Sequence, residues 1–108
     1  MRFFETPIFT RVVTELLEDD EYRGLQLALL IQPRAGRVIR GSGGLRKLRW
    51  SKSDQGKRGG IRIIYFWEPS SETFYLLYAF PKNEQEDLTA VQLKTLGRLV
   101  REEFHEKR

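Results

Sequence analysis

Apolar residues in the first third of the chain recur at helical spacing. Thr6 and Pro7 make a helix start, because a threonine hydroxyl can accept an unpaired N–H and proline already has a helical φ. The apolar residues that follow have the i, i+3, i+4, i+7, i+8 spacing of one buried helical stripe: Phe9, Val12, Val13, Leu16 and Leu17. Asp19 and Asp20 are good N-caps, so we expect a second helix to begin there and to end at the next proline. With a short aromatic strand over residues 1–5, this predicts a strand followed by a packed pair of helices.

The rest of the chain changes to strand spacing and then returns to helical spacing. Three strands are predicted by alternating, β-branched or aromatic runs, over residues 45–51, 61–67 and 73–80. Residues 34–44 are predicted to be loop, because the GSGG run needs backbone freedom. Thr89 and Gln92 form a capping box for a last helix, which we expect to run to about His105. The predicted order is β-α-α-β-β-β-α, one α+β domain over residues 1–108 with a small antiparallel-rich sheet and helices packed on one face.

One segment of the chain holds most of its positive charge. Between Arg34 and Arg62 there are ten lysines and arginines against one acid, Asp54, so this segment carries a formal charge of +9 and the rest of the chain −5. A basic cluster of this density usually binds phosphate. A membrane surface is disfavoured, because these bases alternate with glycine and apolar residues rather than following an amphipathic helix. The absence of a signal peptide, and of any apolar run of ~20 residues, predicts a cytoplasmic protein with no membrane partner.

Several enzyme classes lack the residues that they need. The chain has no cysteine, which excludes disulfides, thiolate metal sites and cysteine nucleophiles. Its single histidine, His105, supports neither a paired-histidine ribonuclease site nor a zinc site. One carboxylate in the basic segment does not make a two-metal nuclease. GKRGG lies between two strands rather than before a helix, so it is not a phosphate-binding loop of the nucleotide-binding kind.

Strand periodicity divides the basic residues between two faces. In residues 45–51, Lys47 and Arg49 lie on one side and Leu48 and Trp50 on the other. Arg46 shares the apolar side, from which its long side chain can reach solvent at the strand end. The first face is therefore a cationic strand face and a candidate surface for phosphate.

Arg62 is the only charge in an otherwise apolar strand, and a cation there is costly to bury unless a partner or ligand meets it. Lys82 and Asn83 follow the last strand. If the strands pair in sequence order, these side chains could converge on one concave patch. The arginines from Arg34 to Arg40 have a simpler interpretation, as solvated charges or as groups that steer the protein towards phosphate.

Three segments, GSGGLRKLRW, GKRGGIRIIYFW and FYLLYAFPKNEQEDLT, together resemble the RelE/ParE superfamily of bacterial toxins, and most closely its HigB-type RelE-like members. The resemblance covers essentially the whole chain in element order. It implies a RelE-like fold and a ribosome-dependent endoribonuclease, an mRNA interferase that cleaves mRNA in the ribosomal A site. The implied partners are mRNA, the ribosome with its 16S rRNA, and a cognate helix-turn-helix antitoxin. No metal and no small-molecule cofactor is implied.

The resemblance also implies which residues act in the reaction. The phosphate-binding arginine of the family matches Arg62, its basic strand residues match Lys47 and Arg49, and its late-strand basic residue matches Lys82. Attack of a ribose 2′-hydroxyl on the adjacent phosphate builds negative charge on the phosphoryl oxygens, which preorganised cations stabilise. We assign that role to Arg62. Neighbouring cations favour the neutral form of a lysine amine, so either Lys47 or Lys82 could be the general base.

Binding of RNA phosphates is expected from the remaining polar and basic residues of the site: Arg46, Arg49, Asn83, Lys57 and Arg58. The last two lie in residues 51–60, a connection longer than two adjacent strands need and therefore predicted to be functional or mobile. The chain departs from the family at two positions. Asn83 replaces a familiar second arginine, and a base-stacking tyrosine of some members falls at or near Thr89.

Two other functions are also compatible with this sequence. A ParE-like inhibitor of DNA gyrase would share the fold without needing a cationic patch. A simple RNA-binding or ribosome-binding module would keep salt-dependent binding and cleave nothing.

Overall fold

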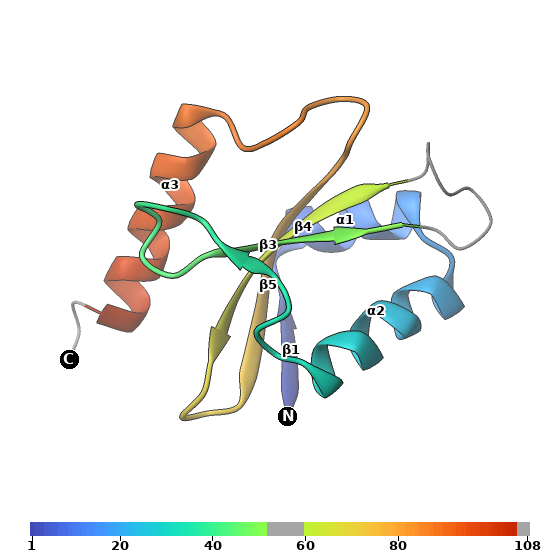
Figure 1. The fold of residues 1–108 in the computed structure, drawn as a ribbon, viewed down its shortest axis with the longest axis horizontal. Coiled ribbons are helices and arrows are strands. Elements are labelled where there is room, and N and C mark those ends of the chain that lie inside the picture. The colour runs from blue at the N-terminus through green and yellow to red at the C-terminus, as the bar shows by residue number, and fades with distance from the viewer. Residues whose placement is uncertain (52–59, 106–108) are drawn as a thin grey trace.

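The structure is a computed structural model, and it describes residues 1–51 and 60–105. Within these ranges one five-stranded sheet has the order β1-β5-β4-β3-β2 (Figure 1). The elements are β1 (Arg2–Glu5), α1 (Pro7–Leu16), α2 (Asp19–Ile31), β2 (Arg37–Val38), β3 (Arg46–Trp50), β4 (Ile61–Glu68), β5 (Thr73–Pro81), α3 (Ala90–Val100) and a π-helical turn, η1 (Arg101–His105). The predicted α+β class is confirmed, as is the order of the three helices and the four longer strands. None of these helices is long and apolar enough to cross a membrane.

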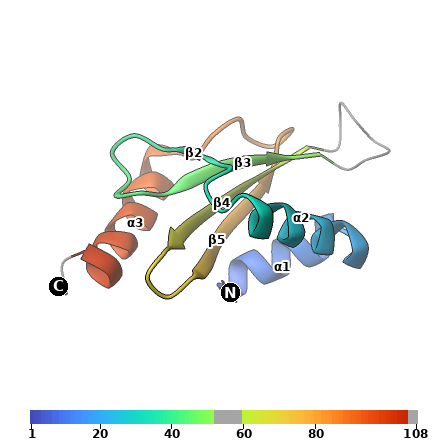
Figure 2. The ribbon, with the colours of Figure 1, turned by 60° about the horizontal axis from the view of Figure 1, so that its bottom comes forward.

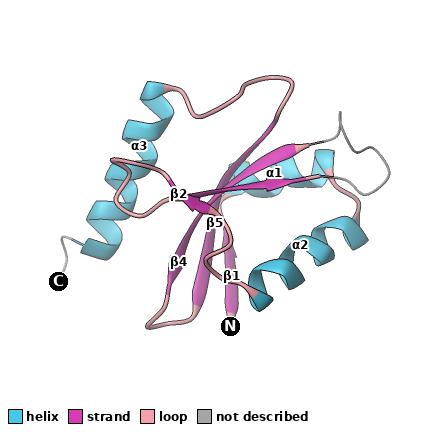
Figure 3. Ribbon diagram, viewed as in Figure 1, coloured by secondary structure: helices cyan, strands magenta, loops and turns pink. Residues whose placement is uncertain are grey.

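The sheet is mainly antiparallel, as predicted. β4 pairs antiparallel with β3 and with β5, whereas β1 pairs parallel with β5. The short strand β2 is an addition to the predicted order, because the sequence indicates loop over residues 34–44 (Figure 3). Two residues are too few to show a period in the sequence. The pairing of β2 with β3 places Arg37 opposite Lys47.

The helices begin close to where their caps predict. Thr6 caps α1, with its hydroxyl accepting a hydrogen bond from the Phe9 N–H at 3.1 Å. The N-cap of α2 is Glu18, one residue before the predicted aspartates, and its N–H donates to a carboxylate oxygen of Glu21 at 2.8 Å. The aspartates occupy the first turn instead, where negative charge favours the positive end of the helix. The capping box at the start of α3 is confirmed.

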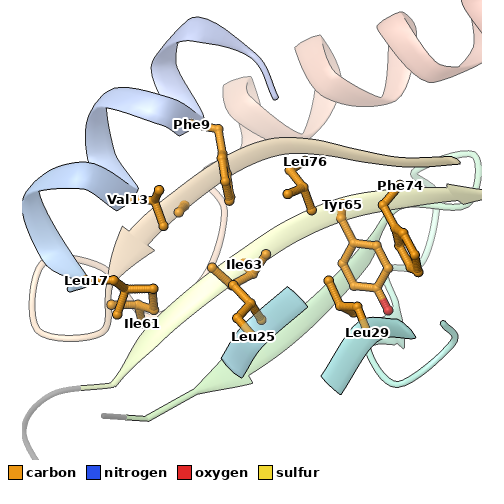
Figure 4. Packing of buried hydrophobic residues seen from close by; sticks show 11 residues of the cluster. Phe9, Val13, Leu17, Leu25, Leu29, Ile61, Ile63, Tyr65, Phe74 and Leu76 are labelled. Atoms are coloured by element: carbon orange, nitrogen blue, oxygen red, sulfur yellow. The ribbon is translucent and has the colours of Figure 1, made fainter. Parts of the chain in front are cut away.

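The helices cover both faces of the sheet. Side chains of α1 and α2 pack together on one face of β4 and β5 (Figure 4): Phe9, Val13, Leu25, Leu29, Ile63, Tyr65, Phe74 and Leu76. A second cluster lies under α3 on the other face: Leu45, Ile64, Phe66, Leu77, Phe80 and Val100. Figure 2 shows α3 on the opposite side of the strands from α1 and α2. The expected single helical layer therefore needs correction, because apolar residues occupy both faces of β4 and neither can be left in water.

The glycine-rich segment before β3 packs against α3. Gly41, Gly43 and Gly44 have φ of 73°, 79° and 114°, so the predicted need for backbone freedom is confirmed. Ser42 between them is fully buried, and its hydroxyl donates to the Ile39 carbonyl at 2.6 Å. A Cβ added at Gly97 of α3 would lie 3.3 Å from the Ser42 carbonyl oxygen, so the absence of a side chain allows this close approach.

Candidate active site

Strand register brings the principal cations to one face of the sheet, the face that α3 also covers. Lys47 of β3 lies opposite Ile64 of β4, and Arg49 lies opposite Arg62. Because paired residues of antiparallel strands project to the same side, Lys47, Arg49 and Arg62 share this face. The predicted side for Lys47 and Arg49 is therefore confirmed. Two like charges directly opposite each other destabilise a sheet, so the Arg49–Arg62 pair does not serve folding. Its placement indicates a site for an anionic ligand.

Arg62 is buried, with 5% of its surface exposed. The neighbouring residues 61 and 63–66 of β4 are buried and apolar or aromatic, which confirms the predicted cation among apolar strand residues. In the described ranges no carboxylate forms an ion pair with its guanidinium. Gly60 lies beside it. A Cβ added at Gly60 would lie 3.9 Å from Nη1 of Arg62 and 3.9 Å from Cδ of Lys82.

Lys82 extends the pairing of β4 with β5 by one residue, since its N–H donates to the Gly60 carbonyl at 3.0 Å. Cδ of its exposed side chain and Nη1 of Arg62 both lie near Gly60. The side chains of these two residues therefore both pass close to Gly60. Asn83 follows as an exposed residue of the turn after β5. Lys57 and Arg58 lie outside the described residues.

Lys47 forms an ion pair that the sequence does not predict. Its Nζ lies 2.9 Å from Oδ2 of Asp87, in the connection between β5 and α3. The hydrogen bond from Lys47 lowers the pKa of Asp87, and the N–H of Leu88 and the charge of Arg62 act in the same direction against the effect of partial burial. Asp87 therefore stays ionised at neutral pH, in contact with Lys47 and within the electrostatic influence of Arg62.

Arg46 is not brought together with the other cations. It lies opposite Tyr65, whose side chain belongs to the core under α1 and α2, so Arg46 shares the apolar side as predicted. Its Nη1 donates to the carbonyls of Gly36 at 2.8 Å and Arg34 at 3.3 Å. These bonds hold the connection between α2 and β2.

Arg37 joins the cationic face, although the sequence indicates only a loop residue there. A depression at the β3 edge is lined by Ala35, Arg37, Lys47, Leu48 and Arg49. Its three cations suit a phosphate chain. Sequence reasoning missed Arg37 because it missed β2. It missed Asp87 because no spacing rule links residues 40 positions apart.

Comparison with known proteins agrees with this fold. The family model described as "RelE toxin of RelE / RelB toxin-antitoxin system" matches residues 1–106. Among solved structures, the chain is similar to a double arginine-to-alanine mutant of the E. coli toxin RelE in the free state, with a TM-score of 0.58 and 13% sequence identity. That match covers 90% of this chain and 93% of the RelE chain. The model match spans nearly the whole sequence, and the chain therefore belongs to the RelE family of toxins from toxin–antitoxin systems.

Proposed function

We propose that this toxin is a metal-independent, ribosome-dependent endoribonuclease that cleaves mRNA in the ribosomal A site. The observation that carries the proposal is Arg62, a buried cation that lies beside Gly60, close to the side chain of Lys82, and shares its sheet face with Lys47 and Arg49. A cation without a carboxylate partner is an unfavourable component of a core, and an anion that develops during a reaction would supply the missing partner.

The reaction that fits is attack of a ribose 2′-hydroxyl on the adjacent phosphorus. The 2′-oxygen forms a bond to phosphorus, the bond to the 5′-oxygen breaks, and the products are a 2′,3′-cyclic phosphate and a free 5′-hydroxyl. One group must take the proton from the 2′-hydroxyl and another must supply one to the leaving oxygen. The nucleophile is part of the RNA, so this route needs no metal-activated water. Arg62 stabilises the charge on the phosphoryl oxygens.

The two lysines take different roles in this proposal. The ammonium of Lys47 is held in an ion pair with Asp87, which suits a phosphate-binding group. In the described part of the chain no carboxylate pairs with Lys82, and the cation beside it is Arg62. Lys82 is therefore our choice for the general base, with Arg49 and Arg37 holding the RNA backbone.

The partners follow from the same proposal. We infer a HigB-type toxin that acts in the cytoplasm and that is neutralised by a cognate helix-turn-helix antitoxin encoded beside it. Co-expression of the neighbouring open reading frame tests this inference, because the antitoxin should restore growth.

A purified translation system tests the cleavage. Wild-type protein should cut ribosome-bound mRNA, and Arg62→Ala and Lys82→Ala should each abolish cutting and growth arrest while remaining folded. Undiminished cleavage by both variants would show that the site is elsewhere. DNA supercoiling defects without mRNA cleavage would instead indicate a gyrase inhibitor, and ribosome binding without cleavage a simple binding module.

A further inference from the structure

The connection between β5 and α3, orange in Figure 1, is tied by hydrogen bonds both to the cationic face and to the start of α3. At one end Asp87 binds Lys47. At the other end the side chain of Gln85 donates to the Asp87 carbonyl at 2.7 Å and to Oε1 of Gln92 at 2.9 Å. Gln92 in turn donates to the Tyr78 hydroxyl at 3.2 Å. The bonds form a continuous chain from β5 through the α3 cap to β3.

The carboxylate of Asp87 is fixed at both oxygens. Oδ1 accepts a hydrogen bond from the Leu88 N–H at 2.9 Å, and Oδ2 accepts from Lys47 at 2.9 Å. Leu88 packs against the core under α3. The orientation of the carboxylate is therefore set by the backbone, although 59% of the Asp87 side chain is exposed.

We propose that Asp87 is a positioning residue that holds the ammonium of Lys47 on the reacting face. This inference rests on the proposed function. It concerns a residue to which the proposed reaction gives neither a proton transfer nor a contact with the phosphate. A lysine side chain is a flexible four-carbon stem with a point charge, so it needs an external contact to keep one place. Its ammonium has three donors, and one bond to Asp87 leaves two for a phosphate.

Asp87 also offsets the repulsion within the site before RNA arrives. Lys47, Arg49 and Arg62 are like charges on adjacent strands. The negative charge of Asp87 interacts with both Lys47 and Arg62, so it lowers the electrostatic free energy of holding them close together. The rival interpretation is that Asp87 competes with the RNA phosphate for Lys47. The two interpretations predict opposite changes in rate when Asp87 is neutralised.

Asp87→Asn is the discriminating variant. Its side-chain oxygen can still accept from Leu88, whereas its NH₂ group presents a donor to the Lys47 ammonium in place of an acceptor. Glu86→Gln is the matched control, because it removes the same charge from an exposed neighbour in the same connection. Thermal unfolding followed by circular dichroism should show a single cooperative transition for both variants, with the midpoint of Asp87→Asn lowered by no more than the few degrees that loss of one exposed ion pair allows.

The measurement is single-turnover cleavage of mRNA on purified ribosomes, with the ribosome concentration varied. We expect Asp87→Asn to lower the maximal rate constant roughly ten- to a hundredfold, with little change in the half-saturating concentration, because a misplaced group slows chemistry more than it weakens binding. Glu86→Gln should cleave at the wild-type rate. In a Lys47→Gln background Asp87→Asn should have a much smaller effect, because only the weaker interaction of Asp87 with Arg62 remains.

Each other outcome counts against the inference. An equal or faster rate for Asp87→Asn would overturn it, and a faster rate would favour competition with phosphate. An equal loss with and without Lys47 would show that Asp87 acts independently of that lysine. Failure of the wild type itself to cleave mRNA would instead overturn the proposed function, and this inference with it.

Discussion

Arg62 shows how far single residues of this site depart from what folding alone would favour. It is buried in β4, lies directly opposite Arg49 and has no ion-pair partner in the described ranges. We predict that Arg62→Met raises the free energy of unfolding by about 1 kcal/mol, because a similar apolar side chain replaces a poorly compensated charge. The same variant should lose mRNA cleavage. Urea unfolding and the translation assay measure the two effects, and a marked loss of stability would indicate a structural role for the guanidinium.

Gly60 is the residue at which Arg62 and Lys82 meet, and its lack of a side chain keeps that point open. A methyl group there would lie 3.9 Å from each of the two, which is ordinary van der Waals contact. Gly60→Ala should therefore fold with an unchanged thermal midpoint, yet cleave mRNA roughly tenfold more slowly, because the phosphate must approach the same point. Wild-type cleavage by a folded Gly60→Ala protein would place the phosphate elsewhere.

The Lys47–Asp87 pair also has a consequence for stability that depends on pH. The pKa of Asp87 is lowered in the folded protein, so the stabilisation by its carboxylate is complete above the ordinary aspartate pKa and is lost as the pH falls through the folded value. Because the Asp87 side chain is largely exposed, the gain is no more than about 1 kcal/mol. Urea unfolding of wild type and Asp87→Asn should thus differ at pH 7 and converge as the pH falls through the lowered pKa of Asp87. A difference that stays constant would assign the effect to another contact.

At the scale of secondary structure, Tyr65 connects the helical hairpin to the sheet. Its hydroxyl donates to the Pro33 carbonyl at 2.8 Å and accepts from the buried Gly36 N–H at 3.0 Å. Tyr65→Phe should lower the free energy of unfolding by about 1–3 kcal/mol, because it leaves a buried N–H without an acceptor. An unchanged urea midpoint would mean that water replaces the hydroxyl.

Helix caps and apolar spacing predict the long elements well because these signals are local. Thr6 and the capping box at Thr89 set helix starts within a few residues of sequence. The strand β2 and the position of α3 depend instead on contacts distant in sequence. β2 exists through its pairing with β3, and α3 covers the second apolar face of β4. The near-continuous apolar run in β4, which lacks apolar–polar alternation, is the signal that could have predicted helices on both faces of the sheet.

At the scale of the whole molecule, the division of charge between segments predicts phosphate binding, and the fold decides which cations take part. Strand parity places Lys47, Arg49 and Arg62 together, so this part of the site follows from the sequence. Arg37 and Asp87 enter through tertiary pairing, which no local pattern contains. Arg46, although central in the basic segment, is directed to loop carbonyls on the opposite side.

The placement of the arginines on different faces predicts that their substitutions change the salt dependence of RNA binding by different amounts. Each cation that neutralises a phosphate releases counterions, so it adds about 0.7 to the slope of log affinity against log salt for a single strand. Arg49 lies on the cationic face, whereas Arg11 is an exposed residue of α1, which packs on the other face of the sheet. Binding can be measured on ribosomes that carry a 2′-O-methylated mRNA, at fixed magnesium and varied potassium chloride, because the methyl group blocks the nucleophile. Arg49→Gln should reduce the slope by about 0.7 and Arg11→Gln should leave it unchanged. Equal reductions for the two variants would mean that RNA responds to the net charge of the protein rather than to this face.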